Sequence, residues 1–124
     1  MIILTKTPEL VSKFKKNYLY LRKQMRVISK RALVEYYTKH ADAKIALEVW
    51  YKKVKQLEWN NFSDLRRAFG SADNVGNKRV VFNIKGNDYR LVAIVQYDLK
   101  RVFVRFIGTH SEYDRLTEEM IKQI

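Results

Sequence analysis

The chain has no cysteine, a single proline and only two histidines. Without cysteine it can form no disulfide bond and no thiolate metal site, and it has no cysteine nucleophile. The two histidines, His40 and His110, lack the HExxH spacing of a zinc site. No apolar run approaches the ~20 residues that a helix needs to cross a bilayer. These absences favour a cytoplasmic protein without a metal ion or other cofactor.

Two common catalytic signatures are also missing. The stretch 70–78 superficially resembles a phosphate-binding loop, but Gly76 is followed by Asn-Lys, and the stretch precedes a strand where that loop precedes a helix. Ser111, His110 and Asp114 could be drawn as a catalytic triad. They are close neighbours in sequence, however, and the glycines of a nucleophile elbow are absent. The sequence therefore does not support hydrolase chemistry of either kind.

The chain has few acidic residues for its number of basic ones. The 13 Asp and Glu oppose 25 Lys and Arg, which leaves a formal net charge of +12 on 124 residues. Such an excess attracts polyanions through counterion release and long-range steering. Nucleic acid is the first candidate partner and an acidic protein the second. With 47% hydrophobic residues we expect one globular domain with a single core.

The stretch 78–113 contains three runs of branched and aromatic residues, separated by 85–88 and 98–100, and this pattern predicts two tight hairpins. Side chains of a strand alternate between its faces, so each run should have an apolar and a basic face. The predicted apolar face carries Val80, Phe82, Ile84, Val102, Val104 and Phe106. The predicted basic face carries Arg79, Asn83, Lys85, Arg101 and Arg105, with Phe103 among them.

Helices are predicted before and after these strands in the sequence. After a strand-like entry at 26–29, Ser29 can cap a helix containing Leu33, Tyr36 and Tyr37. A second helix should begin at Asp42 as its cap. Its apolar stripe would comprise Ile45, Ala46, Val49, Trp50, Val54 and Leu57. Its other face carries Lys44, Lys52, Lys53 and Lys55, for which a solvated face is favoured over a phosphate-binding one.

Three further segments complete the pattern. A short helix is expected over 64–69, and 71–77 should be irregular. Thr109 and Glu112 have the spacing of a capping box, which predicts a final helix. The apolar stripe of that helix, which should pack on the sheet, comprises Tyr113, Leu116, Met120 and Ile124.

Residues 1–24 stand apart from this pattern. They carry six basic residues against Glu9 alone, so five of the twelve excess charges lie there. A basic arm or a targeting peptide is one interpretation, but no apolar core and cleavage site of a signal peptide follow. We favour an appended segment outside the domain, which would then comprise residues 25–124.

RNA can be cleaved by the residue types that remain, because its own 2′-hydroxyl serves as the nucleophile. The protein must supply a base, cations for the charge that develops on phosphate, and an acid. Arg90 and Arg105 are the candidate cations, since each lies inside a strand run. A solvated position, or pairing with Asp88, Asp98 or Asp114, is equally compatible with the pattern.

Two further residues are candidates for the chemistry. The imidazole of His110 is suited to proton transfer near neutral pH, although a histidine at a helix start is more often a capping or surface residue. Tyr113 lies in the apolar stripe, which indicates a core position from which only its hydroxyl could take part.

Two sequence runs carry a resemblance to a known family. The run Val81–Leu91, VFNIKGNDYRL, and the run Val104–Asp114, VRFIGTHSEYD, resemble the HigB-type toxins of bacterial type II toxin–antitoxin systems. The likeness extends from Met25 to the C-terminus, with 26–33 similar to the start of the family and Trp50-Tyr51 to its second helix. It implies the RelE/ParE-like fold, an α+β domain with a small antiparallel sheet flanked by N-terminal helices and a C-terminal helix.

The resemblance also implies a function and partners. HigB-type toxins are mRNA interferases, endoribonucleases that commonly act on the ribosome. A helix-turn-helix antitoxin of the HigA type binds them and represses the shared operon, so operator DNA is contacted only through the antitoxin. The family-matching positions are Asn83, Arg90, Arg105, His110, Tyr113 and Asp114.

Our hypothesis for the site gives each group a role. Arg90 and Arg105 would hold the scissile phosphate, His110 would transfer a proton, and Tyr113 would orient or stack on a base. The residues expected to contact RNA along its backbone are Lys78, Arg79, Asn83, Lys85 and Arg101. Two other functions remain open, a ParE-like gyrase poison and a non-catalytic nucleic-acid-binding module.

Overall fold

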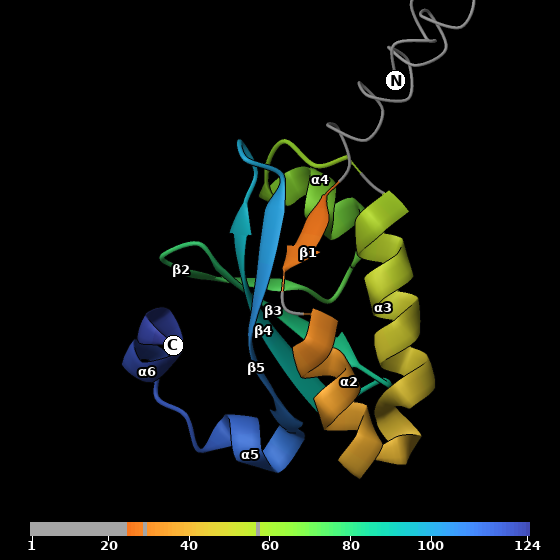
Figure 1. Ribbon diagram of the computed structural model, residues 1–124. Coiled ribbons are helices and arrows are strands. Elements are labelled where there is room, and N and C mark those ends of the chain that lie inside the picture. Colours follow the sequence, from red (N-terminus) through yellow and green to blue (C-terminus); the bar gives the residue numbers. More distant parts are fainter. Residues whose placement is uncertain (1–24, 29, 57) are drawn as a thin grey trace, which may run out of the picture.

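The computed structural model describes residues 25–28, 30–56 and 58–124. The predictions for 1–24, for Ser29 as a cap and for Leu57 lie outside these residues. The described chain forms a five-stranded sheet in the order β1-β5-β4-β3-β2, with helices on both faces (Figure 1), which confirms the predicted α+β class. Within this part of the chain, no helix has the length and apolar composition required to span a bilayer.

The sheet is built mainly from two hairpins. Strands β3 (Arg79–Ile84), β4 (Tyr89–Gln96) and β5 (Arg101–Thr109) pair antiparallel, and their turns occupy the positions that the sequence predicts. The short β1 (Arg26–Ile28) pairs parallel with β5. Since only β1 runs parallel to its neighbour, the sheet is mostly antiparallel.

The prediction of an irregular segment over 71–77 is wrong, because Asp73–Gly76 forms the edge strand β2. The turn from β2 to β3 has positive φ at both Asn77 (48°) and Lys78 (65°). Two such residues are the mark of the tight turns whose twist matches a hairpin, and asparagine tolerates this conformation well. In this stretch the sequence excluded a phosphate-binding loop, but the turn was not predicted.

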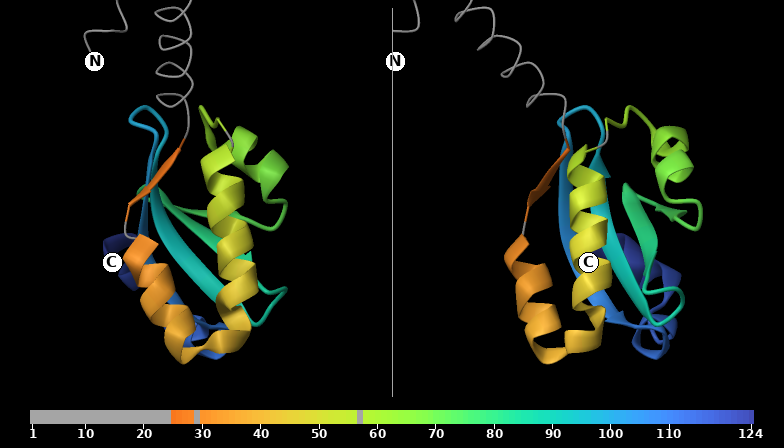
Figure 2. Two further views of the ribbon diagram at one scale, coloured as in Figure 1. Left: turned by 45° about the vertical axis from the view of Figure 1, so that its right-hand side comes forward. Right: turned by 90° about the vertical axis from the view of Figure 1, so that its right-hand side faces the viewer.

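The larger core lies between one face of the sheet and helices α2 (Lys30–Lys39), α3 (Lys44–Gln56) and α4 (Phe62–Ala68), as both views of Figure 2 show. Rings from three elements interlock there: Phe82 meets Trp50 at 5.4 Å and Phe69 at 5.1 Å between centroids. Edge-to-face packing of this kind adds to the burial of large apolar surface. Met25 is buried in the same core.

Helix α3 buries a different stripe from the predicted one. Trp50 and Val54 are buried as predicted, and Ala46 packs against the core, but Ile45 is 77% exposed and Val49 57% exposed. Leu47, which the predicted stripe omitted, is fully buried. The helix is rotated toward Leu47 because Ala43, Leu47, Trp50 and Val54 lie at intervals of four, three and four residues. Lys44, Lys52, Lys53 and Lys55 are exposed, as predicted.

Asp42 is not the predicted helix cap. It lies in the 3-10 turn η2 (Ala41–Ala43) between α2 and α3, and its carboxylate is bound by two side chains of the β3–β4 hairpin. By contrast, Asn61 caps α4 through a hydrogen bond of 2.9 Å from the Asp64 amide to its side-chain oxygen.

The second face of the sheet is not simply basic. Val81 and Val92 are buried there under two short helices, α5 (His110–Asp114) and α6 (Glu118–Gln123). The final helix is therefore split, and Thr117 caps its second part. Tyr113, Leu116 and Ile124 pack in this smaller core as predicted, but Ile121 is buried in place of Met120, which is 51% exposed. The expected single stripe fails because the helix does not continue past Asp114.

A β-bulge in β5 changes the face to which Phe106 points. Val104 pairs with Ala93 and Phe106 with the adjacent Val92, which leaves Arg105 as the extra residue. Strict alternation would put Phe106 with Val102 and Val104 in the larger core. Beyond the bulge the alternation is reversed, and Phe106 packs in the smaller core instead.

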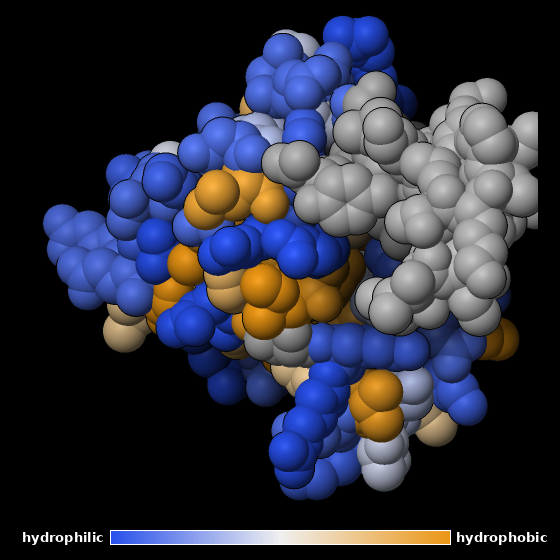
Figure 3. Space-filling view, turned by 45° about the horizontal axis from the view of Figure 1, so that its top comes forward, coloured by the Kyte–Doolittle hydropathy of each residue, from blue (hydrophilic) through white to orange (hydrophobic). Residues whose placement is uncertain are grey.

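One face of the molecule (Figure 3) shows how polar and apolar side chains are distributed over its surface. In Figure 3, where the top of Figure 1 comes forward, hydrophilic side chains surround small hydrophobic patches. Such an arrangement is expected for a chain in which charged residues make up 31% of the sequence.

Candidate functional site

The register of the sheet places Arg90 at the centre of a row that crosses three strands. Arg90 pairs with Asn83 on β3 and with Gly108 on β5. Residues paired across antiparallel strands point to the same face, so these three lie on the face covered by α5 and α6. In the next row on that face Val92 is flanked by Val81 and Phe106, and all three pack in the smaller core.

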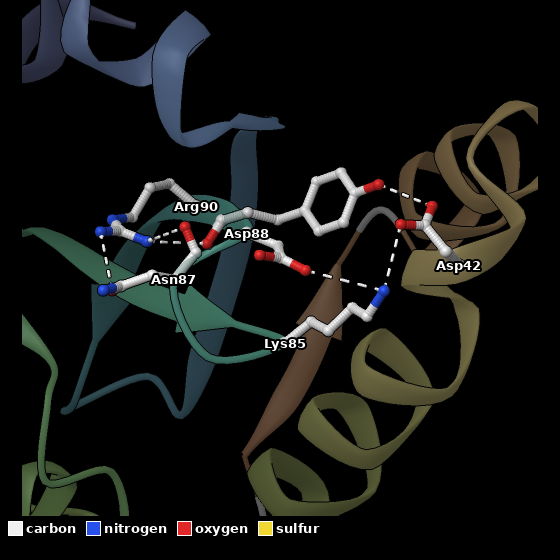
Figure 4. A network of polar contacts seen from close by, with 6 residues as sticks. Asp42, Lys85, Asn87, Asp88 and Arg90 are labelled. Carbon is white, nitrogen blue, oxygen red and sulfur yellow. Dashed lines mark hydrogen bonds and ion pairs between the residues drawn. The ribbon is translucent and has the colours of Figure 1, made fainter.

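The guanidinium of Arg90 is held by neutral acceptors of the preceding turn. Its Nη1 donates to the backbone oxygens of Asn87 at 3.2 Å and Tyr89 at 3.1 Å, and its Nη2 donates to Asn87 Oδ1 at 3.2 Å. Figure 4 shows the Arg90 and Asn87 side chains directed toward one another. Among the described residues no carboxylate lies within ion-pair distance of Arg90. Its position is fixed while its charge is not neutralised, which is the condition for binding an anion.

Tyr113 packs in the smaller core, on the face of the sheet to which Arg90 points. Burial raises the pKa of the Tyr113 hydroxyl, the Asp73 carboxylate raises it further, and the positive charge of Arg90 lowers it. The Tyr113 ring also packs beside Phe106, with 6.4 Å between centroids. The hydroxyl is therefore protonated at neutral pH and can donate a hydrogen bond, but it is a poor base.

Gly108 leaves room for the Phe106 ring. A Cβ atom at position 108 would lie 2.6 Å from Phe106 Cζ and 3.3 Å from Glu112 Cβ. Real Cβ contacts are not this short, so any larger residue would displace the ring or the start of α5. Glycine at this position thus supports the wall of the site that contains Tyr113.

The start of α5 is held by the predicted capping box. The Glu112 amide donates to Thr109 Oγ1 at 3.1 Å, and the Thr109 amide donates to Glu112 Oε1 at 2.9 Å. The His110 amide donates to the backbone oxygen of Asp88 at 3.0 Å. Because Asp88 belongs to the turn that also holds Arg90, the first turn of α5 and Arg90 share one support.

The imidazole of His110 is oriented by a carboxylate on its own helix. His110 Nδ1 lies 2.7 Å from Asp114 Oδ2. A neutral imidazole that donates from Nδ1 has its lone pair on Nε2, which makes Nε2 the atom able to accept a proton. The side chain of His110 is 45% exposed, so a substrate could approach it.

Arg105, the extra residue of the bulge, lies in β5 beyond Phe103, the last residue that pairs with β1. At this point β5 is the open edge of the sheet. Arg105 is exposed and lines a groove of about 310 Å³ with residues of α2 that include Glu35, Tyr36 and Lys39. No hydrogen bond or ion pair joins Arg105 to Arg90, His110 or Tyr113 within the described residues. Arg90 and Tyr113 therefore lie on the same face of the sheet, His110 is on the helix of Tyr113, and Arg105 is in β5 outside this group.

The residues expected to contact RNA are dispersed over the molecule. Asn83 lies beside Arg90. Arg79 is on the same face, but it donates to the backbone oxygens of Asn77 at 2.9 Å and of Ile124 at 2.7 Å, and so anchors the end of α6. Lys78 is in the β2–β3 turn, and Arg101 lines a groove with Arg26 and Lys55 at the β1 edge.

Lys85 takes part in a network that the sequence did not reveal. Its Nζ lies 3.2 Å from Asp42 Oδ2 and 3.6 Å from Asp88 Oδ2, and the Tyr89 hydroxyl donates to Asp42 Oδ1 at 2.6 Å. In Figure 4, Asp42 and Arg90 form the two ends of this network. The hydrogen bonds from Tyr89 and then Lys85 lower the pKa of Asp42, and the bond to Asp42 raises the pKa of Tyr89 to about 12.

An aromatic stack borders this network. The Tyr36 and His40 rings are parallel within 16° and 4.2 Å apart, and Tyr89 meets Tyr36 edge-on at 5.9 Å. The four-residue spacing of Tyr36 and His40 was a sequence signal for their contact. Nothing in the sequence connects them to Tyr89. Among the described residues, no group of three histidine, aspartate or glutamate side chains could hold a metal ion.

Comparisons with a family model and with individual proteins all point to the same family. The model of the HigB toxin family, described as a RelE-like toxic component of a toxin–antitoxin system, matches residues 43–116. The mRNA interferase HigB of Escherichia coli O6:H1 is 35% identical over 95 residues, which cover 75% of this chain and 92% of that protein. The mRNA interferase toxin HigB of Escherichia coli K12 is 30% identical over 95 residues, with 75% and 91% covered. The HigB of Shigella flexneri shows the same values.

Proposed function

Because the chain belongs to the HigB family of RelE-like toxins, the toxic components of toxin–antitoxin systems, we propose that it is an endoribonuclease that cleaves messenger RNA. The relatives named above are mRNA interferases, and they match this chain over 75% of its length. The observation that carries the proposal is the Arg90 guanidinium, which is fixed by neutral oxygens and keeps its charge for a phosphate.

The proposed mechanism uses the 2′-hydroxyl of the RNA and no metal ion. Nε2 of His110 accepts the 2′-hydroxyl proton, with Asp114 holding the imidazole in the required orientation. The 2′-oxygen attacks phosphorus to form a 2′,3′-cyclic phosphate, and the bond to the 5′-oxygen of the next nucleotide breaks. The leaving 5′-oxygen takes up a proton from water and becomes a hydroxyl. Arg90 stabilises the charge that develops on the phosphate, and Tyr113 donates a hydrogen bond to it or stacks on a base. Arg105 contacts a flanking phosphate from the β5 edge.

The proposed partners follow from the family. We propose that the chain acts on messenger RNA in the cytoplasm while it is being translated, so that the ribosome is its working partner. A helix-turn-helix antitoxin of the HigA type neutralises it and contacts the operator DNA. The net charge of +12 supports a polyanionic environment such as ribosomal RNA.

The test is cleavage of an end-labelled messenger by the purified chain, with free RNA in EDTA and with ribosome-bound RNA in magnesium buffer. The proposal predicts products with a 2′,3′-cyclic phosphate and a 5′-hydroxyl. Alanine at Arg90 or His110 should abolish cleavage, while Arg66→Ala, at an exposed position on α4, should not. Products with 5′-phosphate ends, or cleavage of free RNA only when a metal ion is added, would contradict the mechanism. Intact RNA under all conditions would contradict the function.

A further inference from the structure

A second polar cavity lies at the other end of β4 from the Arg90 site. It has a volume of about 700 Å³ and is bordered by the β2–β3 turn, the β4–β5 turn and the loop before α4. Gln96, the last residue of β4, lies six positions after Arg90, which places the cavity ~20 Å away at the usual rise of a strand. The polar and aromatic side chains that line it are those of Asn60, Asn74, Asn77, Lys78, Gln96, Tyr97, Asp98 and Lys100.

The walls of the cavity are fixed by hydrogen bonds. Lys100 Nζ donates to the Trp59 backbone oxygen at 2.6 Å and to Asn60 Oδ1 at 2.9 Å. Asn74 Oδ1 accepts from the Gly76 amide at 3.1 Å, and Asn77 Nδ2 donates to the Lys122 backbone oxygen at 2.8 Å. The side-chain amide of each asparagine thus uses either its oxygen or its NH₂ group for a hydrogen bond within the fold. The other group of each amide has no hydrogen-bond partner among the described residues. These groups are the NH₂ of Asn60, the NH₂ of Asn74 and the oxygen of Asn77.

Gln96 is the feature that the fold does not explain. Its Oε1 is buried and has no hydrogen-bond partner among the described residues. A buried acceptor without a donor destabilises a protein, whereas an apolar side chain of similar shape in its place would not. Gln96 is one of the residues that line the cavity, and rotation of its side-chain amide would bring the oxygen within reach of an N–H group of a ligand bound there.

Lys78 supplies the charge. It is exposed, it lines the cavity, and no carboxylate of the described residues lies within ion-pair distance of it. Tyr97, a half-buried ring on the same wall, offers an aromatic surface. Amide donors and acceptors, an aromatic ring and an unpaired lysine are the groups that bind an unstacked nucleotide of single-stranded RNA.

We propose that this cavity binds one nucleotide of the RNA substrate, with its base against Gln96 and the asparagine amides and its phosphate on Lys78. The inference rests on the proposed function, because it takes RNA as the substrate. The bound nucleotide lies several positions along the RNA from the cleaved bond. The cavity thereby contributes sequence preference in addition to that of the Arg90 site.

The first test is binding of free nucleotides, which does not depend on cleavage. Adding AMP, GMP, CMP and UMP in turn to the isotope-labelled full chain should shift the NMR signals of the Gln96 side-chain amide and of Tyr97. At least one base should shift them more than the others. If no nucleotide shifts either signal at millimolar concentration, the proposal is wrong, whether or not the chain cleaves RNA.

The second test uses variants and a 2′-O-methyl RNA, which cannot be cleaved. Gln96→Met should weaken binding about tenfold, the loss of one amide–base contact, and should leave Tm unchanged or higher because it removes the buried unpaired oxygen. Lys78→Asn removes the charge with a residue that tolerates the positive φ of 65°. It should weaken binding, while Lys52→Asn on exposed α3 surface serves as the matched control.

These outcomes separate the two proposals. Normal cleavage and binding in both cavity variants would overturn the cavity proposal and leave the proposed function intact. Nucleotide-dependent shifts at Gln96 in a chain that cuts no RNA would support the cavity and contradict the ribonuclease. If Lys52→Asn weakens RNA binding as much as Lys78→Asn does, the loss is a general effect of charge, and the proposed role of Lys78 is wrong.

Discussion

The Tyr89 hydroxyl donates a hydrogen bond of 2.6 Å to Asp42 Oδ1 and ties the β3–β4 hairpin to the corner between α2 and α3. Lys85, at the other end of the same turn, binds the second oxygen of Asp42. The turn between them holds the Arg90 guanidinium through Asn87 and the His110 amide through Asp88. Asp42 therefore supports two groups of the candidate site that it does not touch.

Removing this link should loosen the turn. We expect Tyr89→Phe and Asp42→Asn each to lower Tm on the order of a few degrees, because each loses a hydrogen bond to a charged group. RNA cleavage should decrease further than stability alone explains, through kcat rather than KM. Circular dichroism melts and cleavage kinetics on the same samples measure both effects. Arg31→Ala, which breaks an exposed ion pair with Glu35 on α2, is the control and should change neither.

The network also predicts how stability depends on pH. The folded-state pKa of Asp42 lies below 3.8, so its contribution is present above about pH 4 and is lost as pH falls through that lowered pKa. The pKa of Tyr89 rises from 10.0 to about 12, and that of Lys85 rises above 10.5. Their contributions are complete below about pH 10 and are lost as pH rises through the folded values. Melts from pH 9 to 12 should show a smaller loss for Tyr89→Phe than for the wild type; equal losses would contradict the assignment.

Asp114 should act through His110. We expect His110→Ala to lower kcat about 10²–10⁴-fold, as for loss of a general base. Asp114→Asn should lower kcat less, because the imidazole stays but the wrong tautomer becomes accessible. Cleavage rates across pH, with Ser111→Ala as an exposed control on the same helix, test this order. A larger loss for Asp114→Asn than for His110→Ala would exclude a role limited to positioning.

Gly108→Ala should cost about 1–3 kcal/mol of unfolding free energy, since the new methyl group would overlap the Phe106 ring at 2.6 Å. Trimming the ring should restore the space. The double variant Gly108→Ala with Phe106→Leu is therefore expected to be more stable than the sum of its single changes indicates. Urea unfolding of all four proteins measures the coupling, and strict additivity would show that the contact is relieved in another way.

The exposed and buried faces of α3 provide a direct test of the fold. Leu47→Ala should destabilise by about 2–5 kcal/mol because it leaves a cavity in the larger core. Ile45→Ala should change stability by less than about 0.5 kcal/mol, since that side chain is 77% exposed. The sequence-based stripe predicts the opposite order, so urea unfolding of the two variants distinguishes the two arrangements of the helix.

Much of the fold followed from neighbouring residues alone. The β3–β4 and β4–β5 turns, the core face of β3 and the capping box of Thr109 and Glu112 were predicted correctly. Arg90 stays a predicted candidate cation, and no carboxylate of the described residues lies within ion-pair distance of it. Proposed pairs with Asp88 and Asp114 are not formed, because those carboxylates bind Lys85 and His110.

What the sequence determined by itself was the class of the fold, the family and the elements whose signals lie within a few residues of one another. Alternation along a strand and capping of a helix depend on such local spacing. Only the tertiary structure decided the bulge at Arg105, the face of Phe106 and the bond between Asp42 and Tyr89, 47 residues apart. These three features depend on how separate elements come into contact, and the periodicity within one element does not predict such contacts.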